Sequence, residues 1–226
     1  MQPFYLPWVG FFDLIAKADY FVFLDNVKIE KSSWQTRNQI LINNQPSFIT
    51  VSIKGSRNQL ISEVVINDEI KWREKHIATI ANVYKKHPFG KWVLDLVVPV
   101  IEDTSICLLS DLNIELIKII CRNLDIKSKF YMSSQISTSG TKSRRLIEIC
   151  NHFQSTNYYS PKGSKKYIDD ENHFTKSKIN VFYQNIILKK YNQFKSNNFV
   201  SNLSIIDLMA NLGPDETTNY INNLKT

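Results

Sequence analysis

The sequence predicts an α/β fold: a single domain with a mostly parallel sheet flanked by helices, plus an inserted β-hairpin and a helical layer. Short apolar strands alternate with amphipathic helices in the last third of the chain. Two β-rich segments near residue 40 flank a turn, and helical patterns follow them. Because no internal repeat, linker or charge block interrupts the 226 residues, we expect one domain over 1–226.

The first thirteen residues contain two prolines, a glycine and five aromatic residues. The prolines fix their own φ and move the residues before them out of the α region. We therefore expect an extended arch over residues 2–8 that presents Gln2, Tyr5 and Trp8 at a helix N-terminus. Such a position suits an anionic ligand, and it equally suits a plain hydrophobic plug.

The first half of the chain then alternates between helix and strand patterns. Apolar residues at helical spacing predict a helix over 10–18, and the aromatic run that follows predicts a buried strand over 20–24. Segments 35–42 and 47–53 are typical of a β-hairpin. A helix is expected over 68–86, where Pro88 follows its end.

The second half continues with two more helices and then a regular strand and helix alternation. We expect these elements to be helices from residue 90 and over 110–124, strand 129–133, helix 141–153, strands 156–160 and 179–184, and helix 203–212. In sheets of this kind, ligands bind outside the carboxyl ends of the strands.

Composition restricts the partners and the compartment. The 28 basic and 21 acidic residues give a formal charge of +7, which favours a nucleotide diphosphate, a nucleic acid or a membrane surface, although an A/T-rich genome produces the same surplus. No run approaches the roughly 18 apolar residues of a membrane span, and no signal peptide pattern opens the chain. We therefore expect a cytoplasmic protein without a membrane span.

Cysteine and histidine patterns give no metal site. Cys107, Cys121 and Cys150 are odd in number, lack C-x-x-C spacing and lie in apolar patterns, so we expect buried thiols. His76 has no second histidine or carboxylate at metal-ligand spacing. It is a candidate proton acceptor, and the same helical position equally suits a packed core residue.

A dense polar set follows the strand at 20–24. Asp25 can accept a proton or hold a hydroxyl beside Asn26, Arg37 can bind phosphate, and Trp34 can stack on a base or sugar. Asn38 completes this set. The structural alternative is that Trp34 covers the core while Arg37 pairs with Asp25.

A second polar loop follows the strand at 156–160. Tyr159, Ser160, Lys162 and Gly163 combine aromatic rings, a hydroxyl, a basic group and a turn residue, a set that suits a nucleotide diphosphate. The alternative is a solvated basic loop. The common catalytic motifs, including Walker loops, dinucleotide fingerprints, nucleophile elbows and zincin helices, are absent.

Seven blocks of sequence, in order, carry a resemblance to a known family. They are QPFYLPWVGFFD at 2–13, FVFLDNV at 21–27, WQTRN at 34–38, WREKH at 72–76, LSDLN at 109–113, YYS at 158–160 with Gly163, and LSIIDL at 203–208. The chain resembles, from end to end, the WbqC-like family of bacterial proteins. Genes of this family often lie among those for surface polysaccharide and O-antigen (lipopolysaccharide) synthesis.

Two departures from the family pattern stand out. Family members usually have a short apolar strand before the Gln-Pro block, whereas Met1 directly precedes that block here. The usual Gly-Pro pair after Ser160 is replaced by Pro161 and Lys162.

The gene context of the family suggests a sugar substrate, and the basic, aromatic loops suggest a nucleotide. Our leading hypothesis is therefore an enzyme that modifies a nucleotide-linked amino sugar, by acyl or aminoacyl transfer to the sugar amine. An acyl donor is then required, and an aminoacyl-tRNA is one such donor. Lys162 and Arg37 would hold phosphates, Trp34 or Tyr5 would stack, and Asp25 or His76 would take the amine proton. Two other hypotheses are nucleotidyl transfer or adenylation with Mg²⁺, and a basic adaptor that binds RNA or another enzyme.

Overall fold

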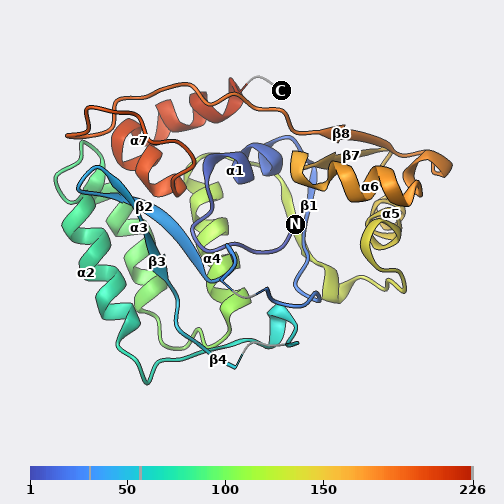
Figure 1. Ribbon diagram of the computed structural model, residues 1–226, viewed down its shortest axis with the longest axis horizontal. Coiled ribbons are helices and arrows are strands. Elements are labelled where there is room, and N and C mark those ends of the chain that lie inside the picture. The colour runs from blue at the N-terminus through green and yellow to red at the C-terminus, as the bar shows by residue number, and fades with distance from the viewer. Residues whose placement is uncertain (31, 56–57, 225–226) are drawn as a thin grey trace.

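A computed structural model describes residues 1–30, 32–55 and 58–224 (Figure 1). Its α-helices are α1 Val9–Ala16, α2 Trp72–Tyr84, α3 Gly90–Glu102, α4 Leu109–Asn123, α5 Lys142–His152, α6 Lys165–Glu171 and α7 Ile205–Asn222. Its strands are β1 Tyr20–Phe23, β2 Arg37–Ile42, β3 Gln45–Thr50, β4 Ile53–Lys54, β5 Val65–Ile66, β6 Lys129–Met132, β7 Asn157–Ser160 and β8 Asn180–Tyr183. The chain therefore has a mixed α/β fold.

Strand pairing departs from the mostly parallel sheet that the sequence predicts. Within the described ranges the strands form four two-stranded sheets. β1 pairs in parallel with β6, and β7 pairs in parallel with β8, whereas β2–β3 and β4–β5 are antiparallel. The expected parallel arrangement is thus present as two separate pairs, with a cleft between β1 and β7.

The inserted hairpin is tighter than its sequence suggests. Asn43 and Asn44 have φ values of 52° and 63°, the left-handed conformation of a two-residue turn that Asn tolerates. Ile42 therefore pairs directly with Gln45. Gln45 and Pro46, expected in the turn, belong to β3, where Pro46 lies opposite Leu41.

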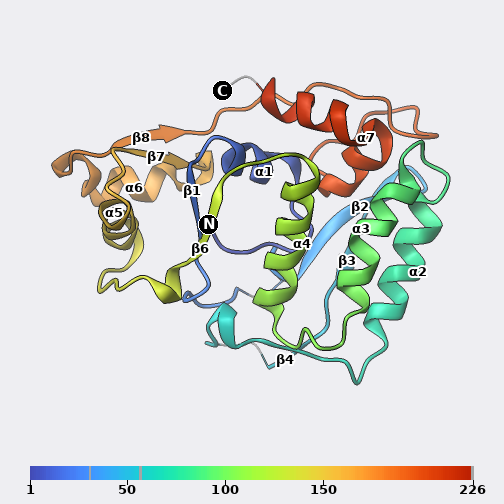
Figure 2. The ribbon, with the colours of Figure 1, turned by 180° about the vertical axis from the view of Figure 1, so that it is seen from behind.

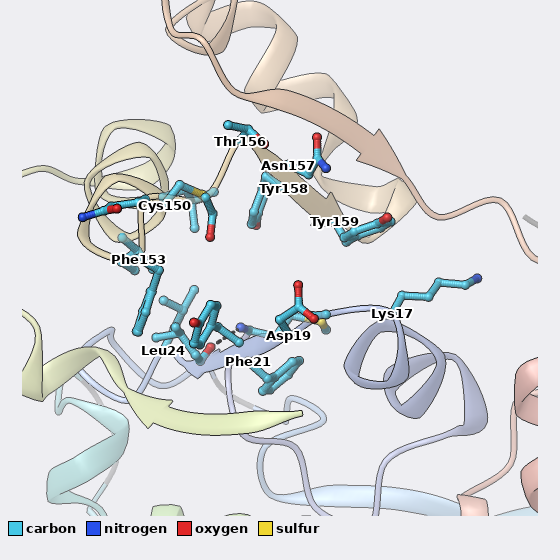
Figure 3. A pocket seen from close by; sticks show the side chains of 18 residues that line it. Lys17, Asp19, Phe21, Leu24, Cys150, Phe153, Thr156, Asn157, Tyr158 and Tyr159 are labelled. Atoms are coloured by element: carbon cyan, nitrogen blue, oxygen red, sulfur yellow. Dashed lines mark hydrogen bonds between the residues drawn. The ribbon is translucent and has the colours of Figure 1, made fainter. Parts of the chain in front are cut away.

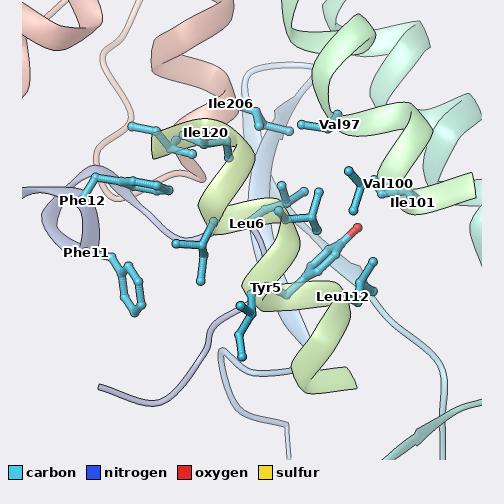
Figure 4. Close-up of a cluster of buried hydrophobic side chains, with 14 of the residues drawn as sticks. Tyr5, Leu6, Phe11, Phe12, Val97, Val100, Ile101, Leu112, Ile120 and Ile206 are labelled. Carbon is cyan, nitrogen blue, oxygen red and sulfur yellow. The ribbon is translucent and has the colours of Figure 1, made fainter. Parts of the chain in front are cut away.

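The main core surrounds α4, which lies between α1, α3 and α7 (Figure 4). Leu112, Leu116 and Ile120 repeat at helical spacing on α4 and are fully buried. Tyr5 and Leu6 of the arch enter the same cluster, so the N-terminal segment is part of the core and not a surface loop. Burial of such side chains is the main stabilising term.

A second, smaller core lies at the other end of the molecule, where α5 and α6 cover β7 and β8 (Figure 2). Its buried members are Leu146, Cys150, Ile168, Phe174 and Ile179. The expectation of a single domain over 1–226 stays a prediction.

Two of the three cysteines are buried as expected. Burial raises the pKa of the Cys121 thiol to about 12 and that of Cys150 to about 11. Cys107, in contrast, is exposed. It lies in the connection between α3 and α4, outside the apolar faces of both helices, and its Sγ contacts the carbonyls of Thr104 and Ser105.

Across the described part of the chain, no helix combines the length and the apolar composition that crossing a membrane requires.

Candidate binding cleft

A cleft of about 410 Å³ lies at the carboxyl ends of β7 and β8, beside α1. Pro161 directly follows β7 and Gln184 directly follows β8, and both line the cleft. Its other walls come from three segments: the arch, helix α1, and the polar segment that follows β1. The lining residues are Met1, Phe4, Trp8, Gly10, Phe11, Leu14, Trp34, Asn38, Pro161, Gln184 and Asn202. Members of all three segments singled out in the sequence therefore meet at one cleft.

The arch turns sharply and is not extended throughout. Leu6 has a φ of 41°, a left-handed conformation that is strained for a residue with a branched side chain. Asn38 donates through Nδ2 to the carbonyls of Tyr5 at 3.1 Å and Leu6 at 2.8 Å, and Ser204 Oγ donates to the Leu6 carbonyl at 2.7 Å. These buried bonds hold the turn. Asn38 is consequently a support of the cleft wall.

Two tryptophans line the cleft together with Phe4 and Phe11. Trp8 is the N-cap residue of α1, and its indole covers Gly10 so closely that a Cβ there would lie 2.3 Å from Trp8 Cζ2. Only glycine permits this contact. Trp34 is 45% exposed, and its ring centroid lies 6.0 Å from that of Phe48. The Arg37 guanidinium lies over the other ring of this pair, 4.2 Å from the Phe48 centroid.

Amide side chains connect the cleft walls. Gln184 Nε2 donates to the Gly10 carbonyl at 2.8 Å and to Asp13 Oδ2 at 2.7 Å, which joins the end of β8 to α1. Gln2 Oε1 accepts a bond from Gln35 Nε2 at 2.8 Å. Gln2 therefore joins the arch to the loop before β2 and does not line the cleft.

Asn113 is a positioning residue that the sequence reasoning missed. It is fully buried on α4, and its Nδ2 donates to the carbonyls of Pro3 at 3.0 Å and Gln35 at 2.8 Å. One side chain thus fixes both the arch and the loop to the central helix. The available signal was a polar residue at helical spacing with the buried Leu116 and Ile120.

Asp25 and Asn26 lie together at the carboxyl ends of β1 and β6, outside the lining set of the cleft. Asp25 is 2% exposed, and its Oδ1 accepts bonds from Ser133 Oγ at 3.1 Å and from the Ser134 backbone N–H at 2.9 Å. Its Oδ2 accepts a bond from Ser134 Oγ. Asn26 Oδ1 accepts bonds from Ser133 Oγ at 2.5 Å and from Arg145 Nη1 at 3.2 Å. Asp25 is therefore held by the turn that follows β6, and Asn26 is held by this turn and by α5.

His76 and Tyr5 form a buried pair between α2 and the core. The Tyr5 hydroxyl and His76 Nδ1 are 3.0 Å apart, and the Trp72 ring packs edge-on against the imidazole. Burial lowers the pKa of His76 to about 4 despite its bond to the Thr50 backbone, and burial raises that of Tyr5 well above its usual value. His76 is thus neutral near pH 7 and lies outside the lining set.

The loop after β7 places its residues in different environments. Tyr159 is 38% exposed and stacks on Phe182, whereas Ser160 is fully buried. Lys162 is exposed and its Nζ donates to Asn185 Oδ1 at 3.2 Å, beside the cleft residue Gln184. Gly163 is exposed with open space around it.

The loop after β7 is short. The lysines at 165 and 166 begin α6 and do not continue the loop. Within the described ranges, no cluster of three or more His, Cys, Asp or Glu side chains has the geometry to hold a metal ion.

These features define a class: a mixed α/β protein with a ligand-sized cleft, rich in aromatic and amide groups, at the carboxyl ends of a parallel strand pair. The chain belongs to the WbqC-like protein family, whose model matches residues 2–219. A Mycobacterium tuberculosis protein named "Uncharacterized protein Rv1507c" is 30% identical over 219 residues, which cover 95% of this chain and 93% of that protein. No solved structure gives a significant match.

Proposed function

We propose that this protein is a cytoplasmic transferase that binds a nucleotide-linked amino sugar in the cleft and transfers an acyl or aminoacyl group to the sugar amine. The family resemblance supports the sugar, because related genes accompany surface polysaccharide synthesis. The nucleotide is supported by the chemistry of the cleft and its rim. O-antigen or lipopolysaccharide synthesis is the setting that this proposal predicts.

The observation that carries the proposal is the pair of tryptophans at the cleft. Trp34 exposes nearly half of its surface there, and Trp8 is held rigidly against Gly10. A large exposed indole is unfavourable in water unless a planar or apolar group covers it. Bases and sugar rings are such groups, and stacking tolerates different bases.

Phosphate binding is assigned to the rim of the cleft. Lys162 directly follows the cleft residue Pro161, and its ammonium group is in solvent, where a diphosphate can reach it. Arg37 does not line the cleft. Its guanidinium lies over the ring of Phe48, which in turn packs against the cleft residue Trp34. The net charge of +7 supports attraction of an anionic substrate.

The proposed step forms one C–N bond and breaks one acyl ester or thioester bond. The neutral sugar amine attacks the acyl carbonyl carbon, its proton passes to a base, and the alcohol or thiol of the donor leaves. A base is needed because a protonated amine has no lone pair. Asp25 and His76 remain the two proposed bases, with Asp25 preferred because it lies at a strand carboxyl end. Because both lie outside the lining set of the cleft, either base would take the proton through an intervening group such as a water molecule.

Calorimetric titration with UDP- and dTDP-linked amino sugars tests the proposal, with UDP, dTDP and free glucosamine for comparison. Trp34→Ala is expected to weaken binding by about 1–3 kcal/mol, the range for loss of a stacked base. Lys162→Ala is expected to cost about 1.5–3 kcal/mol if its ammonium bonds to phosphate. Phe182→Ala and Lys166→Ala are matched controls, because both side chains are exposed and lie outside the lining set.

The outcomes separate the hypotheses. Sugar-nucleotide binding that both variants weaken, with controls unchanged, supports the proposal. Binding of ATP or CTP with Mg²⁺ and release of pyrophosphate would instead identify a nucleotidyl transferase. Tight binding of RNA with steep salt dependence, and of no sugar nucleotide, would identify an adaptor.

A further inference from the structure

The two faces of the β7–β8 pair differ in character. Side chains alternate between the faces of paired strands, and one face packs on the smaller core through Tyr158, Val181 and Tyr183. The opposite face, called the outward face below, has four exposed side chains: Asn157 and Tyr159 of β7, and Asn180 and Phe182 of β8. In Figure 3 the side chains of Tyr158 and Tyr159 leave β7 in different directions, and the Tyr159 ring is the one farther from Cys150 of α5.

An aromatic pair lies at the centre of the outward face. Tyr159 and Phe182 are opposite one another in register, with ring centroids 5.3 Å apart and ring planes tilted by 23°. Their exposed fractions are 38% and 46%. Asn157 and Asn180 form the neighbouring position, where Asn180 Nδ2 donates to Asn157 Oδ1 at 3.3 Å. The face therefore offers a flat apolar surface beside amide donors and acceptors.

The outward face leads into the candidate binding cleft. Pro161 and Gln184 follow the aromatic pair by two residues, and both line that cleft. Gln184 N bonds to the Ser160 carbonyl, so the pairing of the two strands extends to this point. Two residues of a strand span about 7 Å. A ligand stacked on the aromatic pair would thus be an immediate neighbour of a ligand in the cleft.

The charge around the outward face is mainly positive. The segment 156–190 contains seven lysines and three acidic residues. All three acidic residues belong to α6, which packs on the other face of the strand pair through Ile168. Lys178 is exposed two residues before β8, and Lys162 is exposed two residues after β7. Both ends of the face are therefore close to a lysine, which favours an anionic chain.

This combination of groups is typical of single-stranded nucleic acid binding. Bases stack on exposed aromatic rings of a sheet, polar side chains bond to base edges, and lysines attract the phosphates. The shape of the face favours a strand over a compact cofactor, because Asn180 and Phe182 lie outside both ligand-sized clefts. A flat, open face accommodates successive bases, whereas small ligands bind in enclosed pockets.

We propose that the outward face of β7–β8 binds the single-stranded end of an RNA whose terminal ribose carries the acyl group, with one base stacked on Tyr159 and Phe182. This inference rests on the proposed function, for which it names the donor. The sugar amine in the cleft attacks the carbonyl carbon of the ribose ester. A C–N bond forms, the C–O bond to the ribose breaks, and the proton that the amine loses is matched by the proton that the ribose hydroxyl gains.

Fluorescence anisotropy with a labelled single-stranded RNA of six adenosines tests the site. Tyr159→Ala and Phe182→Ala are each expected to weaken RNA binding roughly 5–150-fold, the range for loss of one base stack. Phe182→Leu keeps an apolar side chain on the strand and should still weaken binding at least about fivefold, so the test does not depend on the folding of the alanine variants. Lys178→Ala should lower the slope of the salt dependence by about 0.7.

The matched controls are Tyr167→Leu and Lys166→Ala. Both residues are exposed on α6, on the other side of the strand pair, and both variants should bind the RNA as the unmodified chain does. RNA affinity that is unchanged in the Tyr159 and Phe182 variants would overturn the proposal. Coenzyme A that competes with the RNA and loses affinity in the same variants would also overturn it, because the donor would then be a thioester.

Calorimetry with the sugar nucleotides separates this inference from the proposed function. Trp34→Ala should weaken binding of the sugar nucleotide and leave RNA binding unchanged, whereas Phe182→Leu should do the reverse. Ring-dependent RNA binding by a protein that binds no sugar nucleotide would support the RNA site and contradict the proposed transferase. Sugar-nucleotide binding in the cleft without any RNA binding would overturn the RNA site and leave the transferase standing.

Discussion

At the residue scale, Asp25 and His76 are the two side chains whose chemistry suggests a base, and both have polar partners of their own. The Asp25 carboxylate accepts bonds from two serines, and the His76 imidazole bonds to the buried Tyr5 hydroxyl. Buried polar groups need such partners because leaving them unpaired is costly. Each residue therefore has a definite structural role that a mutational test must separate from catalysis.

Asp25→Asn is expected to lower the free energy of unfolding by about 1.5–3 kcal/mol, the range for bonds to a charged acceptor. The reason is that an amide nitrogen replaces one of the oxygens facing Ser133 and Ser134. Urea unfolding measures the loss, and Asp170→Asn on the exposed face of α6 is the control. Wild-type stability with turnover slowed about 10²–10⁴-fold would instead identify Asp25 as the base.

His76 predicts a definite pH dependence of stability. Its pKa in the folded protein, about 4, lies below the ordinary value of 6.5. Between these pH values the unfolded chain binds a proton that the folded protein does not bind. The free energy of unfolding should thus fall as pH decreases from 6.5 to 4, by on the order of 3 kcal/mol from this residue.

Urea unfolding between pH 7 and pH 4.5 measures this effect by comparison with His76→Gln. The variant should lose much of the pH dependence, whereas His152→Gln, at an exposed position on α5, should keep it. Identical slopes for His76→Gln and the unmodified chain would contradict the assignment.

At the element scale, α4 is the scaffold of the candidate binding cleft. Its apolar residues centre the main core, and Asn113 connects it to the arch and to the loop before β2. The cleft walls are irregular segments, so their positions depend on bonds to a rigid helix.

Asn113→Ala should therefore destabilise the protein by about 1–3 kcal/mol, because it leaves the carbonyls of Pro3 and Gln35 without this donor. It should also weaken sugar-nucleotide binding, although Asn113 does not line the cleft. Asn123→Ala on the exposed end of the same helix is the matched control. Calorimetry that finds both variants alike would remove α4 from the positioning role.

At the scale of the whole molecule, the two cores differ in size and therefore in local stability. The smaller cluster joins α5, α6, β7 and β8, and the larger one surrounds α4. Units with few buried contacts open at lower free energy than the main core. The loop after β7, which borders the candidate binding cleft, belongs to the smaller unit.

Phe174→Ala is expected to cost the smaller unit about 3–5 kcal/mol, the range for a buried Phe. Hydrogen exchange should quicken over residues 142–183 and stay unchanged in α4. Phe12→Ala in the main core is the comparison and should quicken exchange in both regions. Uniform quickening by Phe174→Ala would show that both cores unfold together and would support the single-domain prediction.

The order and type of most elements were predictable from the sequence by itself. Apolar spacing predicted the approximate positions of helices α1 to α5 and α7 along the chain. Runs of aromatic or β-branched residues predicted the positions of strands β1, β6, β7 and β8. These patterns are local, since 3.6-residue and 2-residue periods report which face of a segment is buried. The two β-rich segments likewise predicted the hairpin.

Only the tertiary structure decided how these elements combine. The left-handed turn at Leu6 depends on bonds from Asn38 and Ser204, which are distant in sequence. The burial of His76 against Tyr5 depends on the packing of α2, and so does its low pKa. Such contacts leave no periodic trace in the sequence because they join single residues far apart along the chain.

Strand pairing likewise separates what the sequence predicts from what the tertiary structure decides. The sequence alone determined that strands alternate with helices in the last third of the chain, because strand and helix patterns have different apolar periods. The tertiary structure decided that they form two pairs with a cleft between β1 and β7. Strand pairing is made by main-chain hydrogen bonds, which every residue except proline offers equally, so side-chain identity predicts a strand far better than it predicts that strand's neighbour.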